Sequence, residues 1–132
     1  MTYLLDTNAC IAYLTGRSPR LAARIRSLSP RDFVLCSVVK AELLHGARKS
    51  ANVEANLDRL NAYFAPFTSL PFDDFAAEHY GLIRAELEQK GTPVGPNDLM
   101  IAAVARAHGL TLVTGNLHEF GRVPALRVED WS

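Results

Sequence analysis

Short apolar runs alternate along the chain with longer segments in which apolar residues recur at helical spacing. The short runs are typical of buried strands, and the recurring spacing is typical of amphipathic helices. Strands are expected at 2–5, 33–36, 67–70, 110–114 and around 126–128, and helices are expected to begin at Asp6, Pro19, Ser37, Val53, Asp73 and Asp98. This alternation predicts an α/β fold of three layers, with a central, mainly parallel sheet flanked by helices.

Three of the expected helices carry finer predictions. Ser37 follows an apolar run, and its hydroxyl group is expected to cap the next helix. The segment 99–105 is apolar on nearly all sides, so that helix is expected to be buried. The long helix from Asp73 is expected to face the core through a stripe of Phe75, His79, Leu82, Ile83 and Leu87.

Three carboxylates stand where a carboxylate is hard to accommodate. Asp6 ends the first apolar run, Glu42 lies within the apolar segment 37–44, and Asp98 directly precedes the apolar segment 99–105. The carboxyl ends of parallel strands meet at one edge of a sheet, where ligands bind in such folds, so these side chains can come together. Like charges gathered at one point repel unless a cation lies between them. The sequence therefore predicts a divalent-metal enzyme.

Each of these acids also has a structural explanation. Asp6 and Asp98 could cap helices, because an Asp at a helix start accepts hydrogen bonds from free amide groups. Glu42 could form an ion pair with an arginine, since an unpaired buried carboxylate is strongly destabilising. Both explanations stay open at the level of sequence.

A fourth polar position follows the last central strand. Thr114, Asn116 and Glu119 could project from the same strand end, although Asn116 alone is also typical of a turn. Hard oxygen donors without a His or Cys cluster favour Mg²⁺ or Mn²⁺ over zinc. The predicted cofactor is therefore Mg²⁺ or Mn²⁺.

The four histidines do not indicate a zinc site, because neither HxH nor HExxH occurs. His79 is expected in the core, His108 at a helix end, His118 in a loop and His45 on the surface. A glycine-rich phosphate loop, a GxSxG elbow and a CxxC motif are also absent. Haloacid-dehalogenase-like phosphotransferases need a second Asp where this chain has Asn8, so that chemistry is disfavoured as well.

The composition fits one domain spanning 1–132. The chain is 48% hydrophobic and 21% charged, which is typical of a soluble globular protein. Its apolar stretches are shorter than the ~20 residues that cross a bilayer, and its first residues lack the pattern of a signal peptide. Cys10 and Cys36 lie among apolar residues, as small buried side chains do in a reducing compartment. A cytoplasmic protein with no membrane contact is expected.

Charge gives little sign of a nucleic-acid partner. Lys and Arg number 14 and so do Asp and Glu, so no overall field attracts a polyanion and any RNA contact must be local. One asymmetry is a set of five arginines before Asp32, namely Arg17, Arg20, Arg24, Arg26 and Arg31. They can be solvated helix surface or phosphate contacts.

Four segments in register resemble a known family. They are 4–8, 37–47, 91–98 and 112–120, and together they span nearly the whole chain. The chain resembles the PIN-domain ribonucleases, in particular the VapC toxins of bacterial toxin–antitoxin pairs. The resemblance implies a PIN-like α/β/α fold.

The same resemblance implies roles for individual residues. Asp6, Glu42 and Asp98 would hold the metal, and Asn116 would complete the catalytic site where many PIN domains have an Asp. In close relatives an aromatic residue commonly stands where this chain has Asn97. The supporting positions would be Asn8, Ser37, Thr114 and Glu119.

An activity and its control are implied as well. Members of this family cut single-stranded RNA, often transfer RNA in the anticodon loop, and segment 91–98 is similar to that of enteric toxins that cut initiator transfer RNA. Lys40 and Arg84 are candidates to hold flanking phosphates. A VapB-type antitoxin would plug the acidic site with its C-terminal tail, and a homodimer within a toxin–antitoxin hetero-oligomer is expected. The competing interpretation is a non-catalytic protein-binding or RNA-binding module, which three intact acids disfavour.

Overall fold

The fold is built on a five-stranded sheet in which every neighbouring pair of strands is parallel. The computed structural model describes all 132 residues. In chain order the strands are β1 (Tyr3–Leu5), β2 (Phe33–Cys36), β3 (Thr68–Leu70), β4 (Thr111–Val113) and β5 (Arg127–Glu129). Their order across the sheet is β3-β2-β1-β4-β5, so β1 is central. All five predicted strands are present.

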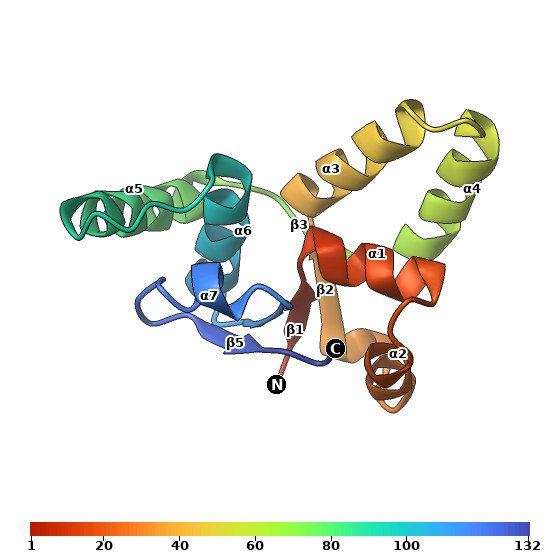
Figure 1. Cartoon of the computed structure of the whole chain (residues 1–132), viewed down its shortest axis with the longest axis horizontal. Coiled ribbons are helices and arrows are strands. Elements are labelled where there is room, and N and C mark those ends of the chain that lie inside the picture. The colour runs from red at the N-terminus through yellow and green to blue at the C-terminus, as the bar shows by residue number, and fades with distance from the viewer.

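Helices cover both faces of this sheet. Figure 1 shows one group to the right of the strands, namely α1 (Thr7–Thr15), α2 (Pro19–Arg26), α3 (Ser37–Arg48) and α4 (Val53–Phe64). The group to the left comprises α5 (Asp74–Gln89), α6 (Pro96–Ala107) and the short α7 (Leu117–Phe120). A 3-10 turn, Pro30–Asp32, leads into β2. The predicted three-layer α/β/α architecture is confirmed.

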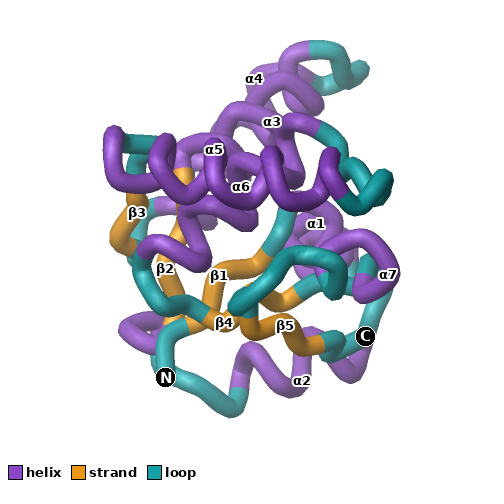
Figure 2. Tube along the Cα trace, turned by 90° about the vertical axis from the view of Figure 1, so that its left-hand side faces the viewer, coloured by secondary structure: helices purple, strands orange, loops and turns teal.

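The longest fully buried segment of the core lies in α6. All side chains from Ile101 to Ala105 are fully buried, because α6 lies between the sheet and α5, as Figure 2 shows from the side of these helices. This position explains the apolar pattern of 99–105. No helix is both long enough and apolar enough to cross a bilayer.

The prediction that Ser37 caps α3 is wrong. β2 extends through Cys36, which still pairs with Leu70 of β3, so the extended N-cap position falls on Cys36. Ser37 is therefore already the first helical residue, and its side chain is exposed.

The predicted inner stripe of α5 is also partly wrong. Phe75 is 51% exposed and Leu82 is 65% exposed, whereas Ala76, Ile83 and Leu87 are buried. α5 packs mainly on α6, at the left edge of Figure 1, and not on the sheet. When a helix packs on only one other helix, the helical spacing of apolar residues does not show which of two adjacent positions, such as Leu82 or Ile83, is buried.

His45 and His108 lie as expected, His79 lies only partly in the core, and His118 differs. His79 is half-buried and its Nδ1 accepts a hydrogen bond from Arg106 Nε at 2.9 Å, and His108 follows the last turn of α6. His45 is exposed. His118 is helical and not in a loop, because Asn116 caps a full turn at α7.

Candidate active site

Asp6 lies at the carboxyl edge of the sheet, where α1 and α3 begin (Figure 1). It follows the central strand β1 and is only 4% exposed. Its Oδ1 accepts a hydrogen bond from the Ala9 amide at 2.8 Å, and its Oδ2 accepts one from the Thr114 hydroxyl at 2.6 Å. Asp6 therefore does cap α1, but this role uses only one of its two oxygens.

The surroundings of Asp6 destabilise its negative charge. Burial raises the pKa of Asp6 above its ordinary value and is the largest influence. The hydrogen bonds from Thr114 and Ala9 lower this pKa, and the nearby charge of Glu42 raises it. A cation at this place would stabilise the ionised form.

Glu42 projects from α3 toward the starts of α1 and α6. The Thr7 hydroxyl donates a hydrogen bond to Glu42 Oε1 at 2.5 Å, and Asn97 Nδ2 donates to Oε2 at 3.4 Å. The ion pairs of the structure are Arg84–Glu88 and Lys90–Glu86, both within or next to α5. The alternative that Glu42 is paired with an arginine is therefore wrong.

Asp98 lies in the first turn of α6 without capping it. The N-cap position is Gly95, and no capping hydrogen bond involves a side chain there. Burial raises the pKa of Asp98 to about 7, and the carboxylates of Glu119, Glu42 and Asp6 raise it as well. Asp98 thus lies within electrostatic reach of three other acids.

These four residues form what we call the acidic cluster, namely Asp6, Glu42, Asp98 and Glu119. No Lys or Arg forms an ion pair with any of them. No three His, Cys, Asp or Glu side chains converge closely enough to enclose an ion as they stand. The donor set nevertheless suits a hard divalent cation, because every member offers carboxylate oxygens and the cluster contains no positive charge of its own.

Asn116 and Glu119 lie together at α7, directly after β4. Asn116 Oδ1 accepts from the Glu119 amide at 3.2 Å, and Asn116 Nδ2 donates to Glu119 Oε2 at 3.0 Å. The amide group of Asn116 thus caps α7 and holds Glu119, which is the turn role that the sequence left open. Glu119 Oε1 accepts from the Gly95 amide at 3.1 Å, so this carboxylate joins α7 to the loop before Asp98.

The remaining supporting positions are more scattered. Thr114 contacts Asp6 directly, and Ser37 lines a hollow beside Glu42. Asn8 is exposed and lines a different hollow, bordered by Arg17 and Trp131. The structure therefore brings Thr114 and Ser37 to the acidic cluster and leaves Asn8 at its periphery.

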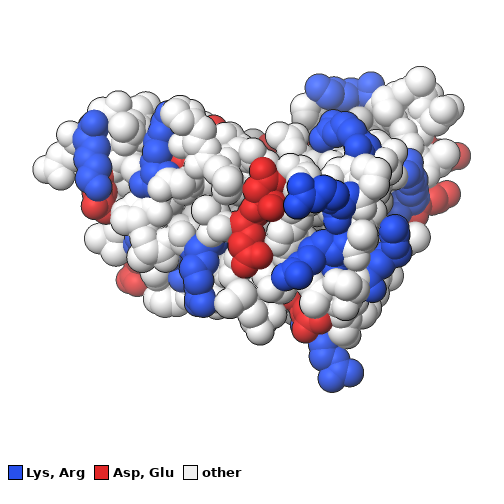
Figure 3. All heavy atoms as spheres, turned by 60° about the horizontal axis from the view of Figure 1, so that its bottom comes forward, with Lys and Arg blue, Asp and Glu red and all other residues white.

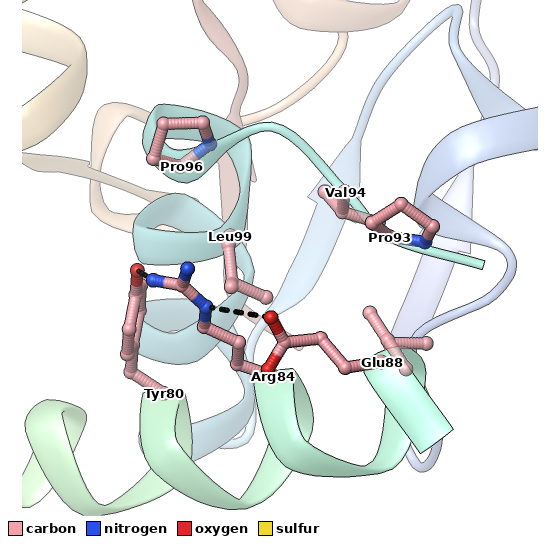
Figure 4. Close-up of a pocket in the computed structure, with 8 residues that line it drawn as sticks. Tyr80, Arg84, Glu88, Pro93, Val94, Pro96 and Leu99 are labelled. Carbon is pink, nitrogen blue, oxygen red and sulfur yellow. Dashed lines mark hydrogen bonds and ion pairs between the residues drawn. The ribbon is translucent and has the colours of Figure 1, made fainter. Parts of the chain in front are cut away.

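The two predicted phosphate contacts do not lie free beside the acidic cluster. Lys40 Nζ lies 4.9 Å from the ring centroid of Phe64 in α4, so its ammonium group packs on an aromatic ring. Figure 4 shows Arg84 on α5, held between Tyr80 and Glu88. Its Nη1 donates to the Tyr80 hydroxyl at 2.9 Å, and its Nε lies 3.5 Å from a Glu88 oxygen. Each of the two cations thus already has a local partner: Lys40 packs on the Phe64 ring, and Arg84 pairs with Glu88.

Sequence reasoning missed the part played by Thr7 and Asn97. Each donates a hydrogen bond to a different oxygen of Glu42, from α1 and α6 respectively. The available signal was their position next to Asp6 and Asp98, since neighbours of site residues at helix starts share the same edge of the sheet.

Basic side chains are concentrated elsewhere on the surface. All five arginines between positions 17 and 31 are exposed. Figure 3 shows basic side chains over the part of the surface where α2 lies, next to a strip of acidic side chains. One of these arginines, Arg24, lies 5.0 Å from the ring centroid of Trp131. The other four form no ion pair in the structure.

Comparisons with known proteins agree with this architecture. The PIN domain family matches residues 3–126. The chain is 42% identical to the tRNA(fMet)-specific endonuclease VapC of Salmonella typhimurium over 131 residues, which cover 99% of this chain and 98% of that relative.

The chain belongs to the VapC family of PIN domains. Among solved structures, DNA-bound VapBC from Salmonella typhimurium has a TM-score of 0.93 at 42% identity, covering 100% of this chain and 99% of that one. VapBC2 from Rickettsia felis, bound to a promoter DNA fragment, has a TM-score of 0.92 at 36% identity and covers 100% of both chains. The resemblance predicted from four segments is confirmed, and endoribonuclease activity is the activity that these comparisons support. PIN-domain nucleases generally depend on a divalent metal ion.

The raised pKa of Asp98 predicts how stability depends on pH. The pKa of Asp98 is about 7 in the folded protein against an ordinary 3.8, so the folded state favours the protonated form of Asp98. The contribution of Asp98 to the free energy of unfolding is therefore fully present below about pH 4 and is lost as the pH rises through about 7. In EDTA, the melting temperature is expected to fall as the pH rises across this window. Solvent screens part of the effect, because Asp98 is only half-buried.

Two variants make this prediction specific. Asp98→Asn is expected to flatten the decline, whereas Asp74→Asn, in the exposed first turn of α5, is expected to retain it. Thermal unfolding across this pH range measures the effect. A melting temperature that rises with pH in the wild-type protein would contradict it.

Proposed function

We propose that this VapC protein is a cytoplasmic, single-domain endoribonuclease that spans 1–132, uses Mg²⁺ or Mn²⁺ and cuts transfer RNA to inhibit translation. The observation that carries the proposal is the acidic cluster, in which four carboxylates gather without a cationic partner. A binding module would gain nothing from repelling the phosphates of RNA at this place. Free Cys10 and Cys36 fit a reducing compartment.

The roles proposed for the site follow from these contacts. Asp6, Glu42 and Asp98 would hold the metal. When bound, the metal would polarise the scissile phosphate and lower the pKa of a water molecule. That water would add to phosphorus as the bond to the 3′-oxygen breaks, leaving a 5′-phosphate and a 3′-hydroxyl.

The other polar side chains would orient these three acids. Thr114 holds Asp6, and Thr7 and Asn97 hold Glu42, each through a hydrogen bond. Asn116 holds Glu119, whose negative charge lies near Asp98. Asn116 would therefore act through Glu119, and Glu119 would complete the donor set.

The substrate proposal depends on relatives and on surface charge. The relatives from Salmonella typhimurium and Shigella flexneri, each 42% identical over nearly their full length, are named as tRNA(fMet)-specific endonucleases. Initiator transfer RNA, cut in its anticodon loop, is accordingly the proposed substrate. Apart from Arg24, which lies over the Trp131 ring, the exposed arginines of 17–31 form no ion pair and no aromatic contact of this kind, so they are proposed for phosphate contacts ahead of Lys40 and Arg84.

A VapB-type antitoxin is the proposed protein partner, since the similar solved structures are VapBC complexes. A groove of about 360 Å³ runs between α1, α3 and α4, with Ile11, Leu14 and Leu43 in its lining and Glu42 at its border. An antitoxin segment in this groove would reach Glu42, and an arginine on it could neutralise the acidic cluster. A homodimer of toxins within the hetero-oligomer is proposed by the same analogy.

Metal removal tests the proposed activity. Purified protein with Mg²⁺ is expected to cut initiator transfer RNA at one bond, EDTA is expected to stop the reaction, and added Mg²⁺ or Mn²⁺ to restore it. Sequencing of the product ends identifies the bond and the 5′-phosphate. Cleavage that survives exhaustive chelation would refute the metal mechanism, and binding of RNA without cleavage in any metal would favour a binding module.

A further inference from the structure

A second hollow also borders Glu42, between α3 and the start of α6. Its volume is about 350 Å³, at the lower end of the ~300–1,000 Å³ typical of small-ligand sites. We call it the α3–α6 hollow, and its lining comprises Ser37, Val38, Ala41, Glu42, His45, Asn97 and Met100.

The lining of this hollow combines apolar surface with free polar groups. Val38 and Met100 are half-buried, whereas His45 and Asn97 are exposed. Asn97 Nδ2 donates to Glu42, but Asn97 Oδ1 and both ring nitrogens of His45 have no hydrogen-bond partner in the protein. A nucleobase has the matching chemistry, because its faces pack on apolar surface and its edges carry donors and acceptors.

The charge of the hollow disfavours a phosphate group. None of the residues that line it is Lys or Arg, and Glu42 contributes a carboxylate without an ion-pair partner. An RNA phosphate would be repelled there, while a neutral base would not. Since Glu42 belongs to both the hollow and the acidic cluster, a base in the hollow would lie beside the phosphate at the metal site.

We propose that the α3–α6 hollow binds one nucleobase of the RNA substrate next to the bond that is cut. This inference rests on the proposed endoribonuclease function and adds to it a place where the identity of a nucleotide is read. His45 and Asn97 are then the residues that determine which base is preferred, because they carry the free polar groups of the lining.

The test combines a variant that fills the hollow with substrates that lack a base. Ala41 is exposed on the lining, so Ala41→Phe would occupy the space without removing a polar group. With wild-type enzyme, an abasic nucleotide at one position beside the cut is expected to lower kcat/KM about tenfold, mainly through KM, as expected for a lost base contact. With Ala41→Phe, the intact RNA should be cut about tenfold less efficiently, and the same abasic position should have no further effect.

A matched variant and an assembly measurement separate the alternatives. Ala55→Phe places the same side chain on an exposed position of α4 and should retain the full sensitivity to the abasic position. If Ala41→Phe cuts both RNAs more slowly by the same factor, it only disturbs Glu42 and the proposal is wrong. If light scattering shows that Ala41→Phe changes the oligomeric state while sensitivity to the base persists, the hollow faces a second copy and the proposal is equally wrong.

The results with wild-type enzyme show whether the nucleobase site or the proposed endoribonuclease function is wrong. Absence of any metal-dependent RNA cleavage would refute the proposed function itself. Metal-dependent cleavage that is insensitive to every abasic position would refute the nucleobase site alone.

Discussion

RNA cleavage should fall by at least ~10³-fold in each of the variants Asp6→Asn, Glu42→Gln and Asp98→Asn, while the fold persists. A bound divalent metal contributes several kcal/mol to the transition state, and each ~1.4 kcal/mol corresponds to a factor of ten in rate. Removal of one negative charge from the acidic cluster relieves repulsion, so the melting temperature in EDTA should be unchanged or higher. Cleavage assays and thermal unfolding of the same preparations measure the two effects.

Matched substitutions outside the acidic cluster provide the control. Glu54→Gln in α4 and Asp74→Asn in α5 make the same chemical changes at exposed positions of first helical turns. Both should cut RNA at the wild-type rate. Unfolding of the Asp6, Glu42 or Asp98 variants would instead show that structural roles of these acids, such as the capping of α1 by Asp6, outweigh the repulsion within the cluster.

Local patterns were sufficient to predict the architecture. Short apolar runs separated by helical segments specify buried parallel strands, and the all-round apolar segment 99–105 specifies the buried helix α6. The orientation of α5 could not be predicted in the same way. Phe75 and Leu82 have the spacing of a core stripe, yet the only large surface available to α5 is α6, and its contact lies one residue further round, on Ala76 and Ile83.

The candidate site was predictable only as far as strand and helix ends determine it. Asp6 and Thr114 follow neighbouring strands, so the parallel sheet brings them together regardless of their separation in sequence. Whether the side chain of Asn116 or that of Glu119 lies near Asp98 was not predictable, because residues one helical turn apart lie on the same face of a helix. The hydrogen bonds of the cap decide it, since they use the amide of Asn116 and leave the carboxylate of Glu119 near Asp98.

Truncation of the antitoxin should restore RNA cleavage without releasing the antitoxin. The groove between α1, α3 and α4 offers apolar contacts at Ile11 and Leu14, and its border at Glu42 reaches the acidic cluster. A partner segment can therefore bind through the groove and inhibit through a separate basic side chain beyond it. The full-length partner should abolish cleavage, whereas a partner that lacks its C-terminal segment should co-purify with the toxin and permit cleavage at near the free-toxin rate.

Competition with the metal makes this separation of binding and inhibition measurable. Because an arginine and Mg²⁺ would neutralise the same carboxylates, raising the Mg²⁺ concentration should relieve inhibition by the full-length partner and leave the truncated complex unaffected. Leu14→Asp in the groove should weaken binding of both forms of the partner, while the free variant still cuts RNA, since Leu14 is not part of the acidic cluster. Full inhibition by the truncated partner would show that the antitoxin acts by blocking the RNA path, and inhibition that does not depend on Mg²⁺ would show that its basic side chain does not reach Asp6, Glu42 or Asp98.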